Sequence, residues 1–181
     1  KPVHGLVKIM RYQIPSPAYI AYHCKTLQAT MSIEKDISQP KFRNEYQKGV
    51  INLIYTYNWL NEKMKALFDK EKITAQQFNI LRILRGAGKP ISTLQIRQRM
   101  LDKMSDTSRI VDRLIIKGLV KKTVCPDDKR LVDVSITEKG SKLLEKMDRY
   151  EPDMDAVFGN LTAAEAKTLN TLLDKIRNPH A

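Results

Sequence analysis

The stretch Ile91–Thr137 reads ISTLQIRQRM LDKMSDTSRI VDRLIIKGLV KKTVCPDDKR LVDVSIT, and it decides the fold. The spacing of its apolar residues predicts a short helix over Ser92–Met100 and a second helix over Ser105–Lys117. Gly118 follows the second helix and is suited to end it. On the second helix, the apolar residues expected to face the protein core are Ile110, Val111 and Leu114.

Two runs of alternating apolar and polar residues follow, Leu119–Val124 and Leu131–Ile136. They are joined by Pro126-Asp127-Asp128-Lys129, which is typical of a hairpin turn. Ile91 is expected to add a one-residue strand to this hairpin. Helix, turn, helix and hairpin together predict a winged helix-turn-helix, whose second helix is expected to enter the major groove of DNA.

The bulk composition agrees with a nucleic-acid partner. The chain has 181 residues, is 42% hydrophobic and carries a net charge of +12, which suits one packed domain without a separate catalytic domain. Residues 41–100 contain 12 Lys and Arg against 4 Asp and Glu, whereas residues 138–181 contain 7 against 8. Such a balance favours nucleic acid before a membrane surface, and a merely soluble basic protein is the alternative.

Several other classes are not expected. The two cysteines, Cys24 and Cys125, suit neither a disulfide scaffold nor a metal site, so a reducing, cytoplasmic location is the simplest interpretation. The sequence shows no membrane-spanning run, no nucleophile–base set and no phosphate loop. An enzyme, a metal site and a cofactor are therefore not predicted.

The regions outside this stretch are expected to be mainly helical. Residues 1–40 are expected to form a leader or an arm. An extension added before Met31 and an arm that wraps a partner subunit both remain open. A long helix is predicted over Phe42–Lys72, and another over Ala163–Arg177. Three helix starts carry capping-box spacing, at Thr74 with Gln77, Ser92 with Gln95, and Thr162 with Glu165. A further helix start is expected at 137–140, where Gly140 permits close approach to a neighbour.

Three segments carry a resemblance to a known family. They are ITAQQFNILRIL (73–84), SDTSRIVDRLIIKGLVKK (105–122) and DKRLVDVSITEKG (128–140). In order and pattern they resemble the MarR family of bacterial transcription regulators, from about residue 42 to residue 177. The resemblance implies a mainly α fold with a small β-hairpin wing. It assigns residues 73–137 to a winged helix-turn-helix and residues 41–72 and 138–178 to helical dimerisation regions.

The resemblance also implies a function. Members of this family are homodimeric, ligand-responsive regulators, most often repressors, so the expected partners are double-stranded DNA, a second copy of the chain and a small aromatic or phenolic effector. Two lobes about 34–36 Å apart would read a pseudo-palindrome. Peroxide-sensing members carry a cysteine near the start of the long first helix. The matching region around Val50 has none, so peroxide sensing by that route is not expected.

The residue types of the second helix of the helix-turn-helix support the same function. Ser105 is expected to cap it, and the hydroxyl groups of Ser105, Thr107 and Ser108 can approach phosphates or base edges. Arg109 can reach a base edge or a phosphate, and Arg113 lies on the same face. Asp112 is expected to pair inside the domain.

In the wing, Arg130 is the favoured contact, because an arginine at a narrow tip meets the enhanced negative potential of the minor groove. In the family the residue matching Asp128 braces the wing arginine, and the same is expected here. Lys129 is a further candidate for phosphate contact. Lys121 and Lys122 are also candidates, with a solvated strand face as the equal alternative.

Two further hypotheses complete the prediction. Tyr55, Trp59 and Arg82 are candidates for an effector pocket, although core or interface anchors are the more frequent role of such aromatic residues. The alternative to DNA binding is a protein-interaction or dimerisation module, since winged helices also serve as scaffolds. RNA binding is less expected, because no exposed aromatic platform is evident.

Overall fold

The computed structural model describes residues 32–124 and 132–178. The chain divides into two units, residues 1–54 and 55–181, and each is described by itself. In the first, α2 (Ile33–Asp36) precedes the start of α3 (Glu45–Lys70), and Lys48 and Glu34 form an ion pair at 2.6 Å between these helices. α3 is one continuous helix of 26 residues that runs on into the second unit.

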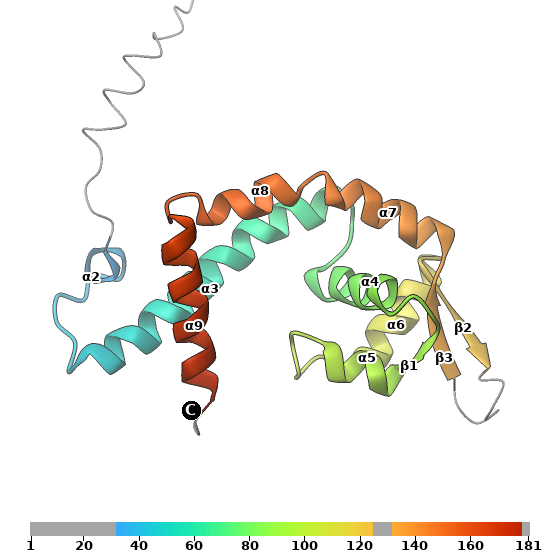
Figure 1. The fold of residues 1–181 in the computed structure, drawn as a ribbon, viewed down its shortest axis with the longest axis horizontal. Helices are drawn as coiled ribbons and strands as arrows, with labels where there is room; N and C mark the ends of the chain where they lie inside the picture. The colour runs from blue at the N-terminus through green and yellow to red at the C-terminus, as the bar shows by residue number, and fades with distance from the viewer. Residues whose placement is uncertain (1–31, 125–131, 179–181) are drawn as a thin grey trace, which may run out of the picture. The chain divides into compact units, whose positions relative to one another are not determined.

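The second unit contains the remaining elements in the expected order. After α3 come α4 (Ala75–Ala87), β1 (Ile91–Ser92), α5 (Thr93–Arg99), α6 (Thr107–Ile116), β2 (Val120–Val124) and β3 (Val132–Ile136). They are followed by α7 (Glu138–Asp148), α8 (Glu151–Asp155), the short 3-10 helix η1 (Ala156–Phe158) and α9 (Ala163–Arg177). Figure 1 shows α4, α5 and α6 gathered beside the small sheet. The mainly α fold with a winged helix-turn-helix is therefore confirmed.

The strands form one antiparallel sheet in the order β1-β3-β2. In the hairpin, Val120 lies opposite Ile136, and Ile91 of β1 lies opposite Val134 of β3. The prediction that Ile91 adds a short strand is thus confirmed. β1 ends where α5 begins, so the sheet and the helix-turn-helix share a boundary.

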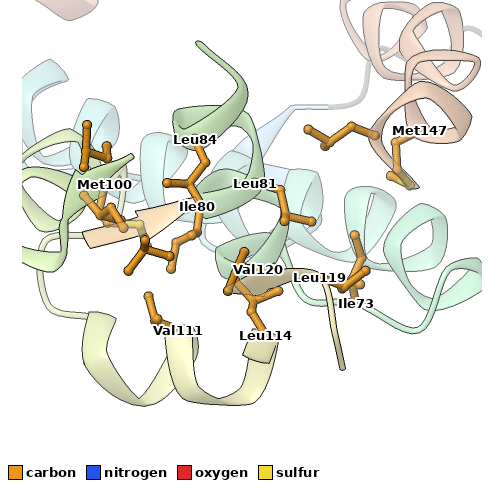
Figure 2. Packing of buried hydrophobic residues seen from close by; sticks show 14 of the residues in the cluster. Ile73, Ile80, Leu81, Leu84, Met100, Val111, Leu114, Leu119, Val120 and Met147 are labelled. Atoms are coloured by element: carbon orange, nitrogen blue, oxygen red, sulfur yellow. The ribbon is translucent and has the colours of Figure 1, made fainter. Parts of the chain in front are cut away.

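The core lies among α4, α5, α6, the sheet and α7. Figure 2 shows side chains from α4, α6 and β2 converging, and Ile80 and Leu114 have no exposed surface. Each apolar side chain of this size contributes about 1.5–3 kcal/mol when it leaves water. The fully buried side chains are Ile80, Leu81, Ile96, Met100, Leu114, Leu144, Met147, Val111 and Val134.

All three capping boxes form as predicted. The side chains of Thr74, Ser92 and Thr162 each accept a hydrogen bond from the backbone N–H three residues later, and a Gln or Glu returns the bond. Each box satisfies N–H groups that the first turn of a helix otherwise leaves without partners. These bonds fix where α4, α5 and α9 begin.

Candidate nucleic-acid interface

The N-cap of the recognition helix α6 lies one residue later than the sequence predicted. Its N-cap is Asp106, whose side chain accepts a hydrogen bond from the Arg109 backbone N–H at 3.1 Å. The prediction that Ser105 caps the helix was wrong. Ser105 instead donates its hydroxyl to Asp102 Oδ2 at 2.5 Å. Both residues are good caps by type, and the turn before the helix decides between them.

That turn is held by side-chain bonds that the sequence reasoning missed. Asp102 also accepts the Met104 backbone N–H at 3.0 Å, and Leu101 donates its backbone N–H to Asn79 Oδ1 on α4 at 3.0 Å. Hydrogen bonds from the Ser105 hydroxyl and then from the Met104 N–H lower the pKa of Asp102. The available signal was Asp102 itself, since Asp often accepts the backbone N–H two residues ahead, here that of Met104.

The exposed face of α6 carries two of the predicted arginines. Arg109 and Arg113 are both exposed and lie four residues apart, hence on one face, with Ser108 beside them. Arg109 Nε lies 3.1 Å from Asp106 Oδ2, and 81% of its side chain remains exposed. The guanidinium is therefore oriented by its own cap while it stays accessible.

Thr107 does not belong to this exposed face. Only 4% of the residue is exposed, and its hydroxyl has no hydrogen-bond partner among the described residues. The prediction of Thr107 as a DNA contact was therefore wrong. Thr107 lies four residues before Val111 and seven before Leu114, so it shares their buried face of the helix.

The hairpin lysines divide between two faces of the sheet. Lys122 Nζ lies 2.8 Å from Asp112 Oδ1, so the prediction that Asp112 pairs inside the domain is confirmed. Lys121 is exposed and, as the next residue on the strand, points to the opposite face. The two lysines are therefore not a paired phosphate clamp. The wing contacts Lys129 and Arg130, with Asp128, lie outside the described residues.

The C-terminal end of α6 is fixed as firmly as its start. Gly118 follows the helix with a φ of 70°, a left-handed conformation that ends a helix. Residues other than glycine rarely adopt this conformation, which is why glycine was expected to end the helix here. Lys117 Nζ donates to the Lys72 carbonyl at 2.6 Å, and Lys139 Nζ donates to the Lys117 carbonyl at 2.8 Å. Lysines that cap the carbonyl ends of helices are electrostatically favoured. The recognition helix is thus held at both ends.

Tyr55, Trp59 and Arg82, the three residues proposed for an effector pocket, are each partly or largely exposed. Tyr55 and Trp59 are 39% and 41% exposed. Arg82 Nη1 lies 3.2 Å from Glu151 Oε1 and forms an ion pair with it. Four cavities of the described residues are lined by other side chains. The role of these three residues in effector binding stays a prediction.

A different cavity, of about 520 Å³, lies between α3 and the turn before α6. Tyr57 and Asn61 of α3 line it, together with Asn79, Asp102 and Lys103. It therefore borders Asn79 and Asp102, which hold the turn in place.

The described residues also bear on other classes of site. Within 32–124 and 132–178, no helix is long and apolar enough to cross a membrane. The same parts of the chain contain no group of three or more His, Cys, Asp and Glu side chains placed to hold a metal ion.

Comparison with known proteins places the chain among regulators. A model of the MarR family matches residues 73–132. The multiple antibiotic resistance protein MarR of Salmonella typhimurium is 33% identical over 128 residues, which cover 68% of this chain and 88% of that protein. The HTH-type transcriptional repressor IacR of Pseudomonas putida is 29% identical over 146 residues, or 78% of this chain and 84% of IacR.

Two solved structures show the same fold. A mutant MarR from E. coli complexed with operator DNA matches with a TM-score of 0.64 at 28% identity, covering 81% of this chain and 99% of that one. Bordetella bronchiseptica BpsR, whose DNA binding is regulated by 6-hydroxynicotinic acid, matches with a TM-score of 0.62 at 26% identity, covering 70% and 96%. The chain therefore belongs to the MarR family of transcription regulators.

Proposed function

We propose that the chain is a sequence-specific repressor that binds double-stranded DNA as a homodimer and releases it in response to a small molecule. The observation that carries DNA binding is the recognition helix α6. It is fixed at both ends, and it exposes Ser108, Arg109 and Arg113 on one face. A rigid helix with accessible arginines suits readout in the major groove.

The charge of the chain supports the same function. Of its ionisable side chains, 32 are Lys or Arg and 20 are Asp or Glu. Arg97 and Lys103 are exposed on α5 and on the turn before α6, close in sequence to the recognition face. Phosphate contacts by such groups release counterions, so binding should weaken steeply as salt rises.

The homodimer is proposed from the apolar face of α3. Residues that recur at helical spacing place one row along this helix, and its C-terminal members Met64 and Phe68 pack into the core. The N-terminal members are exposed, between 48% and 86%: Tyr46, Val50, Leu53, Ile54 and Tyr57. A monomer gains nothing from such a row, whereas a second copy can cover it. On α9, Leu172 and Ile176 are 53% and 70% exposed, so this helix also carries apolar side chains that a partner can cover.

This assignment gives the domains their roles. Residues 73–137 read DNA, and residues 41–72 and 138–178 hold two copies together. A pseudo-palindromic operator then matches the two-fold symmetry of the dimer, with half-sites about one helical turn apart.

The effector is proposed to occupy the cavity of about 520 Å³ between α3 and the turn before α6. Tyr57 offers an aromatic face, Asn79 an amide, and Lys103 a cation for a carboxylate, which together suit a small aromatic or phenolic acid. A ligand regulates only when it binds two arrangements of the turn with different affinity. Competition for Asn79 or Asp102, which position the turn, provides that difference.

The decisive experiment is footprinting on the region upstream of the chain's own gene, followed by titration with a fluorescent duplex of the protected site. Arg113→Ala and Arg130→Ala should each weaken binding by about 1–3 kcal/mol. Lys142→Ala is the control, because this exposed lysine pairs with Glu138 on α7. Protection should disappear when a small aromatic acid fills the cavity, and Asn79→Leu should abolish that response.

The outcomes separate the candidate functions. A protein that retards no duplex, including its own upstream region, would instead be an interaction module, the alternative that the exposed row of α3 also suits. If no aromatic acid changes the affinity for DNA, the chain would remain a proposed repressor, but the proposed effector site would be wrong.

A further inference from the structure

Met104 is the most exposed large apolar side chain of the described residues, at 93%. It lies in the turn before α6, two residues before the Asp106 cap. Isolated apolar side chains are common on protein surfaces. Met104 differs because it lies in a turn whose conformation is fixed by four hydrogen-bonding groups. These groups are the Asp102 carboxylate, the Met104 N–H, the Ser105 hydroxyl and the Asn79 amide.

A hollow of about 450 Å³ opens beside Met104, between α5 and the first turn of α6. Its apolar wall is formed by Met104 and by Leu94 of α5, which is 63% exposed. Arg97, Thr107 and Ser108 also line it. The hollow is therefore continuous with the face of α6 that carries Ser108 and Arg109.

The geometry points to Met104 as a specificity-determining residue that packs on the C5-methyl group of a thymine, with Leu94 on the other side of that methyl. This inference rests on the proposed DNA binding. Among the four bases only thymine presents a methyl group at the edge of the major groove. The arginines and hydroxyl groups of the same face can bind phosphates of any sequence, whereas an apolar pair distinguishes bases. Methionine suits this contact because its side chain is unbranched and adaptable.

The test removes the methyl group alone. Each thymine of the footprinted operator is replaced in turn by deoxyuridine in one half-site, and affinity is measured by fluorescence anisotropy. With the native chain, one replacement should weaken binding about fourfold, the effect of exposing one methyl-sized group. With Met104→Ala the same replacement should change nothing, and Met104→Leu should restore the difference.

Leu101→Ala is the matched control. Leu101 belongs to the same turn and is 86% exposed, but it lines the other cavity with Tyr57 and Asn79. This variant should keep the full response to deoxyuridine. Thermal unfolding followed by circular dichroism confirms that each variant is folded.

The outcomes distinguish this inference from the function on which it rests. If the native chain binds no duplex, the proposed function fails. If it binds its operator but no thymine is sensitive, or if the sensitivity persists in Met104→Ala, only the role of Met104 is overturned.

Discussion

Gly140 lies where the first turn of α7 crosses the start of β2. A Cβ at this position would lie 2.2 Å from the Leu119 carbonyl oxygen and 2.8 Å from Ile136 Cγ1. The backbone oxygen cannot move without disturbing the hairpin, so α7 must shift. We expect Gly140→Ala to lower the free energy of unfolding by about 1–3 kcal/mol, measured by urea denaturation.

Gly86 provides the matched control, because it lies inside α4 and a Cβ there meets nothing within 4 Å. Gly86→Ala should raise the free energy of unfolding by about 0.5–1 kcal/mol through the better helix propensity of alanine. If the two substitutions shifted stability in the same direction and by the same amount, packing at Gly140 would not be the cause.

At the residue scale, the sequence predicted the close approach at Gly140, and the structure confirms it. It failed at the start of α6, where Ser105 and Asp106 are equally good caps by residue type. Thr107 lies four residues before Val111 and seven before Leu114, a spacing that places all three on one face of a helix. Its burial therefore follows from the same pattern that predicted the two core residues. The choice of cap does not follow from the sequence, because the bond between Ser105 and Asp102 forms only in the folded turn.

Between elements, α4 and α7 are joined by an ion pair with two hydrogen bonds. Arg85 donates to both carboxylate oxygens of Asp148, at 2.7 and 2.9 Å. The Arg85 guanidinium lowers the pKa of Asp148. A carboxylate with a lowered pKa stabilises the fold above its unfolded pKa of about 3.9, and this contribution is lost as pH falls through the folded value.

Arg85→Gln should therefore lower the urea midpoint at pH 7 and flatten its decline below about pH 4. The decline that remains belongs to other carboxylates, such as Glu71, whose pKa is lowered by its bond to Lys146. Lys65→Gln is the control, since its pair with Asp69 is exposed and lies within α3. An equal acid dependence in the native chain and Arg85→Gln would contradict this assignment.

At the element scale, prediction worked where both partners are close in sequence. The three capping boxes join residues three apart, so the spacing alone determines them. The pair of Arg85 and Asp148 joins residues 63 apart, and no local pattern shows which of several arginines meets which carboxylate.

For the whole molecule, the exposed row of α3 makes assembly testable. Val50→Glu places a charge in that row, at a position that is 59% exposed, so it should leave the folded chain intact while it breaks the dimer. Sedimentation velocity should then find a monomer, and operator affinity should fall because two half-sites are no longer linked.

Asn52→Glu adds the same charge on another face of α3, two residues away, and should remain dimeric. A native chain that sediments as a monomer, or a Val50→Glu variant that stays dimeric at the same concentration, would contradict the proposed interface.

The long helix itself was predicted well, over 42–72 against the observed Glu45–Lys70. The sequence could not tell which part of its apolar row meets the chain's own core. An apolar stripe has the same spacing whether it packs against its own domain or against a second chain. Only the exposed fractions, low at Phe68 and high at Tyr46, divide the row into two parts.

This division makes α3 a reporter of concentration as well as of folding. Amide hydrogens near Phe68 should exchange with deuterium only when the core opens, whereas in the proposed dimer those near Tyr46 should gain protection from the second copy. In dilute solution, protection should therefore decline along a single unbroken helix from its C-terminal to its N-terminal end. Raising the protein concentration should remove this gradient by mass action, without any change in the core.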